Sequence, residues 1–277
     1  MSIITPDDLP PEGWFTEPMY LANKNKHHRD EKIGFIEETH TYTIGDRSDF
    51  TSVTTFIHKH FPHFDADSVI KNIMKNPEKK QKKYGDMTGE EIKAMWNKSG
   101  EDACALGDYM HKSIEMFYNN KEINNPTLEY QYFKNFQKDH EDLGLIPYRT
   151  EWKVYDEELE LAGAIDMMFI DADNNLHIYD WKRSKQIKKT PFNSDDYGKG
   201  CLEHLPNCNF WHYSLQLNTY KAILEKNYGV NVNDLYLIVM HPNNPNKNYI
   251  KIKCANLQSE VLDMFNNRKK ELVVKNS

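Results

Sequence analysis

The chain has 277 residues, of which 39% are apolar, 12% aromatic and 28% charged, and its net charge at pH 7 is −7. This composition fits one large folded domain and is too aromatic for a disordered chain. The longest apolar runs, Leu235–Met240 and Met167–Ile170, fall far short of the roughly 20 residues of a membrane span, so we expect neither a membrane protein nor a fibrous one.

The N-terminus and the cysteines indicate an intracellular, non-secreted protein. Residues 1–8 contain neither a basic stretch nor a hydrophobic run, so we expect no secretory signal. The four cysteines lie far apart, as is typical of reduced thiols rather than a disulfide framework. An acidic chain binds nucleic acid only through local basic patches, and two are present, at residues 79–83 and 182–189. A lone lysine run is more typical of a solvated surface.

The first 98 residues read as an N-terminal arm followed by a helical region that could guide DNA. Residues 1–32 have an irregular composition, and Thr41–Ile44 reads as a short strand. Apolar spacing predicts helices over Thr51–His60 and Asp67–Lys75. Residues 77–89 are lysine-rich and predicted to be exposed.

A longer helix is predicted to begin at Ser99, with Asp102 in the position of a capping-box partner. Every fourth residue then lies on one narrow stripe of this helix. The stripe consists of Ala103, Gly107, His111 and Glu115. A second helix is predicted from Thr127 to Leu143, ending at Gly144.

The rest of the chain alternates strands and helices, which predicts a mixed α/β core over residues 99–277. The expected strands are Thr150–Tyr155, Glu160–Ile170, Leu176–Lys182, Leu235–Met240 and Tyr249–Lys253. A basic loop over 185–209 leads to an expected helix over 210–228, and a last helix is expected over Gln258–Lys270.

Two acidic residues fall on neighbouring strands of this core. Asp166 lies in the second strand, and Asp180 lies near the end of the third, two residues before Lys182. Alternate residues of a strand share a face, so Asp180 and Lys182 point the same way, and the short turn lets Asp166 approach Asp180. Converging carboxylates repel unless a cation lies between them, and oxygen ligands suit Mg²⁺ or Mn²⁺. His111 could complete the shell and favours manganese slightly.

Each feature also has a plain structural explanation. Asp180 and Lys182 alone are an ordinary surface pair, and His111 alone is an ordinary helix histidine. Gly163 could simply allow close packing. The site is favoured because residues 176–181 are too apolar for an exposed strand, and a buried strand rarely carries an unpaired carboxylate.

The motifs together resemble the RecB-like branch of the PD-(D/E)XK nuclease superfamily. The resemblance is carried by Gly163-x-x-Asp166, Asp180-x-Lys182, Gly107-x-x-x-His111-x-x-x-Glu115 and Gln216-x-x-x-Tyr220. Upstream, Phe50–Phe56 is similar to a segment of phage exonucleases and of mitochondrial genome maintenance exonucleases. These motifs span about residues 50 to 220.

This resemblance implies a restriction-endonuclease-like core with the order αβββαβ. It implies that Asp166, Asp180, the main-chain carbonyl of Trp181 and His111 bind the metal, and that Lys182 is the catalytic lysine. Glu115 and Glu151 are lesser candidates, with salt bridges as the alternative. The resemblance also implies that certain residues touch DNA or brace the cleft: Gln216 and Tyr220 on the later helix, and Arg183, Ser184 and Lys185 in the basic loop.

The function implied is a Mg²⁺- or Mn²⁺-dependent deoxyribonuclease that acts as an exonuclease on single-stranded or free DNA ends and leaves 5′-phosphates. No iron–sulfur cluster is expected, because Cys201, Cys208 and Cys254 lack the family's spacing and read as packing residues. The chain shows no helicase motif, so any unwinding would come from a partner. Two alternatives remain open: an RNA endonuclease with the same site, and a nuclease-like fold that only binds nucleic acid. Part of the N-terminal aromatic set could stack on unpaired bases, with core packing as the alternative.

Overall fold

A six-stranded mixed sheet forms the centre of the structure, a computed structural model that describes residues 4–11 and 13–275. Residues 1–3 of the segment analysed for a secretory signal therefore lie outside it. The strand order is β3-β5-β6-β7-β8, with β4 also paired to β5. The strands are β3 (Thr51–Ser52), β4 (Ile146–Asp156), β5 (Leu161–Ile170), β6 (Leu176–Lys182), β7 (Val232–Val239) and β8 (Ile250–Lys253). Only the β3–β5 and β6–β7 pairs are parallel among those described.

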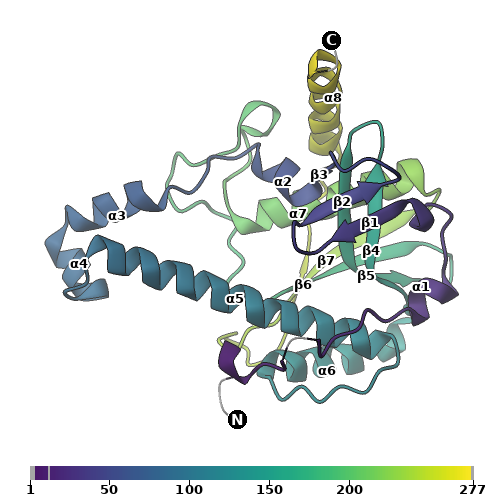
Figure 1. The fold of residues 1–277 in the computed structure, drawn as a ribbon, viewed down its shortest axis with the longest axis horizontal. Coiled ribbons are helices and arrows are strands. Elements are labelled where there is room, and N and C mark those ends of the chain that lie inside the picture. The colour runs from purple at the N-terminus through teal and green to yellow at the C-terminus, as the bar shows by residue number, and fades with distance from the viewer. Residues whose placement is uncertain (1–3, 12, 276–277) are drawn as a thin grey trace.

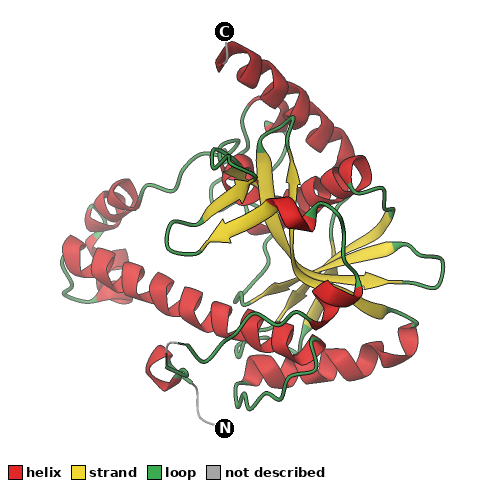
Figure 2. Cartoon of the chain, turned by 45° about the vertical axis from the view of Figure 1, so that its right-hand side comes forward, coloured by secondary structure: helices red, strands yellow, loops and turns green. Residues whose placement is uncertain are grey.

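Helices cover both faces of this sheet (Figure 2). One core packs α2 (Val53–His58), α7 (Asn209–Asn227) and α8 (Gln258–Lys275) against the sheet. A second core, on the other face, packs α5 (Gly89–Tyr118) and α6 (Leu128–His140). Burial of apolar side chains on both faces explains why the central strands are almost continuously apolar. The expectation of a mixed α/β sheet flanked by helices is confirmed.

The N-terminal segment runs across the molecule and adds a small hairpin. It contains a short helix, α1 (Tyr20–Lys24), and a two-stranded sheet of β1 (Ile33–Ile36) and β2 (Thr41–Ile44). The expected strand over Thr41–Ile44 is confirmed, whereas its partner β1 has no prediction from the sequence. Short 3₁₀ helices occupy Pro6–Asp8, Asp30–Lys32, Glu141–Leu143 and Gly200–Leu202.

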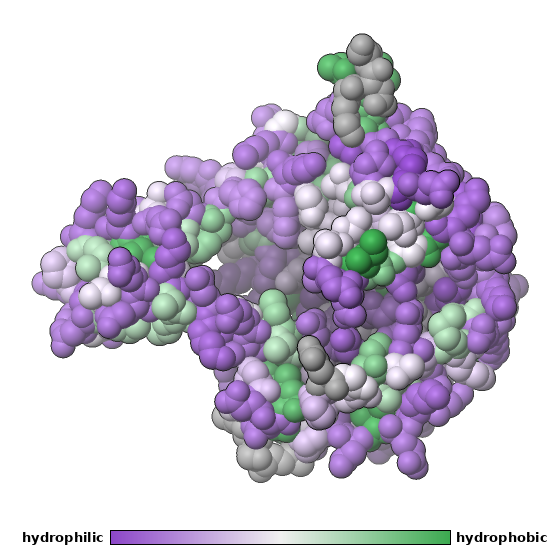
Figure 3. Space-filling model, in the orientation of Figure 1, coloured by the Kyte–Doolittle hydropathy of each residue, from purple (hydrophilic) through white to green (hydrophobic). Residues whose placement is uncertain are grey.

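An arm projects from the body of the molecule (Figure 1). It consists of α3 (Ala66–Met74), α4 (Pro77–Tyr84) and the first half of α5, held by a small apolar cluster of its own. Figure 3 shows a mostly hydrophilic surface with a hollow between this arm and the body. The lysine-rich segment that was expected to be merely exposed therefore includes a helix.

The start of α5 corrects the prediction of a helix beginning at Ser99. Thr88 is the N-cap, and a reciprocal capping box joins it to Glu91: the Glu91 carboxylate accepts from Thr88 N (2.6 Å), and Thr88 Oγ1 accepts from Glu91 N (3.2 Å). Ser99 lies inside the helix, and Asp102 pairs with Lys98 instead of forming a cap (2.6 Å). The expected boundary between residues 98 and 99 thus falls within one continuous helix.

The remaining expected elements are present, with ends shifted by a few residues. In the described part of the chain, no helix is both long and apolar enough to cross a bilayer.

Candidate metal centre

The site lies where β5 and β6 separate. Their antiparallel ladder runs from the Ile170–Leu176 pair to the Met167–Tyr179 pair, and Asp166 and Asp180 come directly after it. Because the strands diverge here, main-chain donors lose their strand partners. The Trp181 N–H donates instead to Asp166 Oδ2 (2.9 Å). The Asp166 carboxylate is thus held at the point where β5 and β6 separate.

Helix α5 brings His111 to the same point. The Trp181 carbonyl accepts a hydrogen bond from His111 Nε2 (3.0 Å). The other ring nitrogen, Nδ1, lies 3.5 Å from Asp166 Oδ2 and 3.7 Å from Glu151 Oε1. A histidine that binds metal usually donates its second N–H to a carbonyl or carboxylate, and His111 has this arrangement. The Trp181 carbonyl, expected as a metal ligand, holds the histidine here instead.

Glu151 is the third member of this cluster. It lies between the Thr150–Met167 and Trp152–Ile165 pairs of the β4–β5 ladder, and so across from Asp166. Its φ is +42°, which is strained for a glutamate within a strand. Among the described residues, the ligand atoms that all lie within 4.8 Å of one another belong to His111, Glu151 and Asp166. From the sequence, Glu151 was a lesser candidate metal ligand than Asp180. The pairing of β4 with β5, which places Glu151 opposite Asp166, was the signal that could have raised its rank.

Asp180 is placed beside this cluster and not within it. Its Oδ2 lies 2.5 Å from Lys182 Nζ, so the expectation that the two side chains share a face is confirmed. The same oxygen is fully buried without a hydrogen bond of normal geometry. Burial raises the pKa of Asp180 to about 7, although the Lys182 ammonium opposes that shift. Trp181 points to the opposite face, where it packs with α5 and α6.

The charges of the site suit a cation. Burial lowers the pKa of His111, but the carboxylates of Asp166 and Glu151 outweigh it and raise the pKa to about 9. A protonated His111 balances part of the carboxylate charge, which is the charge that a divalent ion would balance. One imidazole and two carboxylates, with the Asp180–Lys182 pair beside them, are a donor set that fits Mn²⁺ or Mg²⁺.

Glu115 lies one helical turn beyond His111 but outside the three-residue cluster. It is 94% buried, and burial, together with the charges of Glu151 and Glu17, raises its pKa to about 8. With Glu151 it lines a cavity of about 450 Å³ under the N-terminal segment. A neutral carboxyl next to the cluster is better suited to shaping the site than to binding its cation.

Gly163 and Tyr220 pack against each other behind the site. A Cβ at position 163 would lie 2.6 Å from the Tyr220 hydroxyl oxygen. Tyr220 is buried, so it braces the site, one of the two roles expected for it. Gln216 donates to Thr54 Oγ1 (3.4 Å) and borders a pocket of about 280 Å³ that Lys182 also lines.

The three residues of the basic loop that were expected to contact DNA lie in different environments. Arg183 pairs with the buried Glu129 on α6 (2.7 Å) and is itself largely covered, so Arg183 does not reach toward solvent as expected. The Ser184 hydroxyl donates to the Gln186 carbonyl, and Lys185 is exposed. Of these three residues, the exposed Lys185 is therefore the best placed to contact a phosphate.

The cysteines differ in environment. Cys201 and Cys254 pack against the main core, as expected, whereas Cys104 is exposed on α5 and is not a packing residue.

Comparison with known proteins assigns no family to this chain. No protein-family model and no curated protein matches the chain. Among solved structures, the crystal structure of SSO0001 is similar over 83% of this chain and 78% of that one, at 10% identity and a TM-score of 0.33. A likeness this distant carries no argument about fold or function.

Proposed function

We propose that this protein is a Mg²⁺- or Mn²⁺-dependent deoxyribonuclease with a restriction-endonuclease-like core. The observation that carries the proposal is the convergence of His111, Glu151 and Asp166 within 4.8 Å, next to the buried Asp180–Lys182 pair. Four elements supply these groups: α5 and the three successive strands β4, β5 and β6. A purely structural role rarely gathers so many ionisable groups at the point where strands diverge.

The chain's own residues divide the work. His111, Glu151 and Asp166 would hold the ion, and Asp180 would add an oxygen from its side. The bound ion would act as a Lewis acid toward a phosphodiester. Lys182 stays protonated, because the carboxylates of Asp180 and Asp166 outweigh its burial and raise its pKa. Its ammonium lines the pocket next to Gln216, where it can donate to a phosphate oxygen and stabilise developing charge.

The finer parts of the proposal follow from the family resemblance. The substrate is DNA with a single-stranded or free end, cleaved exonucleolytically to leave 5′-phosphates. Unwinding, where needed, is supplied by a partner such as a helicase.

The test is digestion of end-labelled single- and double-stranded DNA with Mn²⁺ or Mg²⁺, beside Asp166→Asn and Lys182→Met. Both variants should lose activity by orders of magnitude, and EDTA should abolish cleavage by the wild type. Circular dichroism would verify that each variant is folded.

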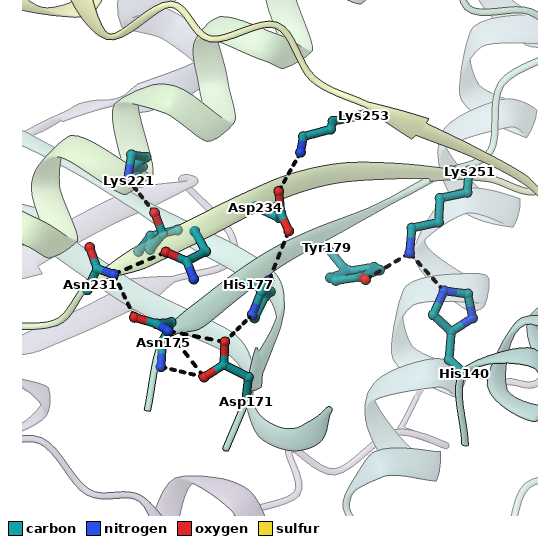
Figure 4. A network of polar contacts seen from close by, with 12 residues as sticks. His140, Asp171, Asn175, His177, Tyr179, Lys221, Asn231, Asp234, Lys251 and Lys253 are labelled. Atoms are coloured by element: carbon teal, nitrogen blue, oxygen red, sulfur yellow. Dashed lines mark hydrogen bonds and ion pairs between the residues drawn. The ribbon is translucent and has the colours of Figure 1, made fainter. Parts of the chain in front are cut away.

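A remote ion pair provides matched controls (Figure 4). Asp234 and Lys253 lie 2.7 Å apart on β7 and β8, away from the cluster. Asp234→Asn and Lys253→Met should keep wild-type activity. Equal cutting by site and control variants would contradict the proposal. Cutting of RNA alone would favour the ribonuclease alternative, and a DNA shift without any cutting would favour a binding module.

A further inference from the structure

Two neighbouring pockets form one groove that starts at Lys182. The first, of about 280 Å³, is lined by Lys182, Gln216 and Tyr213. The second, of about 560 Å³, lies between the α2–α3 connection and the loop over residues 183–208. His58 and His212 line both pockets, so the two lie side by side. We call the two adjacent pockets together the aromatic groove.

Aromatic rings form the walls of the aromatic groove. Phe61 and His212 are in contact, with ring centroids 4.1 Å apart, and the His58 ring lies 5.5 Å from His212. At the outer end, Phe64 is 70% exposed and Phe192 is 87% exposed. These two rings come from opposite walls, one from the α2–α3 connection and one from the loop. Exposed aromatic rings gathered around a concave surface indicate a binding site rather than core packing.

The two walls are fixed to each other by hydrogen bonds to main-chain carbonyls. Lys199 N donates to the His60 carbonyl (2.7 Å), and Asn207 Nδ2 donates to the Pro62 carbonyl (3.3 Å). The position of the loop beside α2 is therefore part of the fold, and the groove is largely preformed.

The charges around the groove separate into an inner and an outer zone. Inside, burial and the charge of the nearby His58 together lower the pKa of His212 to about 4, so this imidazole is a neutral ring. Asp65 and Asp196 also line the second pocket, where they would repel a phosphate. Exposed lysines lie in both segments that form the walls of the groove. Lys59 follows α2, and Lys185, Lys188, Lys189 and Lys199 lie in the loop. Flat uncharged groups therefore suit the inside, and phosphates suit the rim.

We propose that the aromatic groove binds the unpaired nucleotides of a single DNA strand, with bases stacked on Phe64 and Phe192 and the backbone along the lysine rim, leading a phosphate to Lys182. The assignment rests on the proposed nuclease function and states where its substrate lies. Paired bases in a duplex keep their faces stacked on one another, so only a single strand offers free faces to two opposed rings.

The experiment measures the affinity of the full-length protein for a fluorescein-labelled oligothymidine in EDTA, where no cleavage occurs. Phe64→Ala and Phe192→Ala should each weaken binding about fivefold or more, the loss typical of removing one base–aromatic stack. Phe192→Trp should retain affinity, because another flat ring replaces the first. Leu143→Ala, which removes an exposed apolar side chain after α6, is the control and should bind like the wild type.

Cross-linking gives an independent readout. An oligonucleotide containing 5-iododeoxyuridine, irradiated in complex with the wild type, should attach to the peptides that contain Phe64 or Phe192. Cross-links found only in peptides that contain neither residue would contradict DNA binding in the aromatic groove.

The outcomes separate this inference from the proposed function. A Phe64→Ala/Phe192→Ala double variant that binds and cuts single-stranded DNA like the wild type overturns the groove and leaves the nuclease standing. A wild type that cuts no DNA with Mn²⁺ or Mg²⁺, yet binds oligothymidine in a way that depends on Phe64 and Phe192, overturns the nuclease and leaves the groove standing. Duplex binding as tight as single-strand binding, and equally reduced in the double variant, overturns the assignment to a single strand.

Discussion

Position 163 requires glycine, because there is no space for a larger side chain. Any Cβ there would lie 2.6–3.0 Å from three atoms of Tyr220, which is itself buried against the core. The ring has no free space into which to move, so a larger residue forces the strand or the helix to shift. The Gly-x-x-Asp pattern and the Gln-x-x-x-Tyr pattern are thus two halves of one contact.

We predict that Gly163→Ala lowers the free energy of unfolding by about 1–3 kcal/mol, the usual cost of overpacking a core. Urea denaturation measures it. Gly100→Ala is the matched control, because nothing lies within 4 Å of a Cβ at that position inside α5. The control should be neutral or more stable by up to about 1 kcal/mol. Equal stability of Gly163→Ala and wild type would contradict the packing argument.

Helix α5 links the arm to the metal cluster as a single element. Its 30 residues correspond to about 45 Å, and His111 lies in its last third. The N-terminal half contacts the small cluster of Ile70, Tyr84 and Ile92, whereas the C-terminal half packs on the sheet. The first turns of α5 therefore depend more on their cap than the last turns do.

We predict that Thr88→Ala raises amide hydrogen exchange over residues 91–98 about fivefold, which corresponds to the loss of about 1 kcal/mol for an N-cap. Ser99→Ala should leave exchange unchanged or slow it, because Ser99 lies inside the helix and alanine is the better helix former. Faster exchange in Ser99→Ala than in Thr88→Ala would restore the helix start expected from the sequence.

The whole molecule carries a net charge of −7, so its attraction for DNA must come from local cations. Exposed lysines lie in the 183–208 loop, which forms one wall of the aromatic groove, whereas those of α4 lie at the tip of the arm (Figure 1). Salt dependence distinguishes these two positions, because each phosphate neutralised releases counterions.

We predict that a Lys188→Met/Lys189→Met variant reduces the slope of log Kd against log salt for single-stranded DNA by about 1.4, at about 0.7 for each contact on a single strand. A Lys80→Met/Lys82→Met variant of α4 should keep the wild-type slope. Fluorescence anisotropy over a range of NaCl concentrations measures both. An equal reduction in the two variants would place the arm on the DNA as well.

Most of the secondary structure was predictable from the sequence because its signals are local. The alternating and continuous apolar runs marked β5 and β6, and Gly144 marked the end of the helix before β4. Two features were missed although their partners are close in sequence. Strand β1 is short and half exposed, so its apolar pattern is weak, and it pairs with β2 just after it. The α5 cap lies eleven residues before the expected one.

By itself the sequence determined which ionisable residues are available and the order in which they occur along the chain. His111, Asp166, Asp180 and Lys182 were recognised in this way. The tertiary structure placed Glu151 in the tight cluster and paired Arg183 with Glu129. The first outcome depends on the register between β4 and β5, and the second on the packing of α6 against the sheet. The residue pattern of a single strand or helix encodes neither of them.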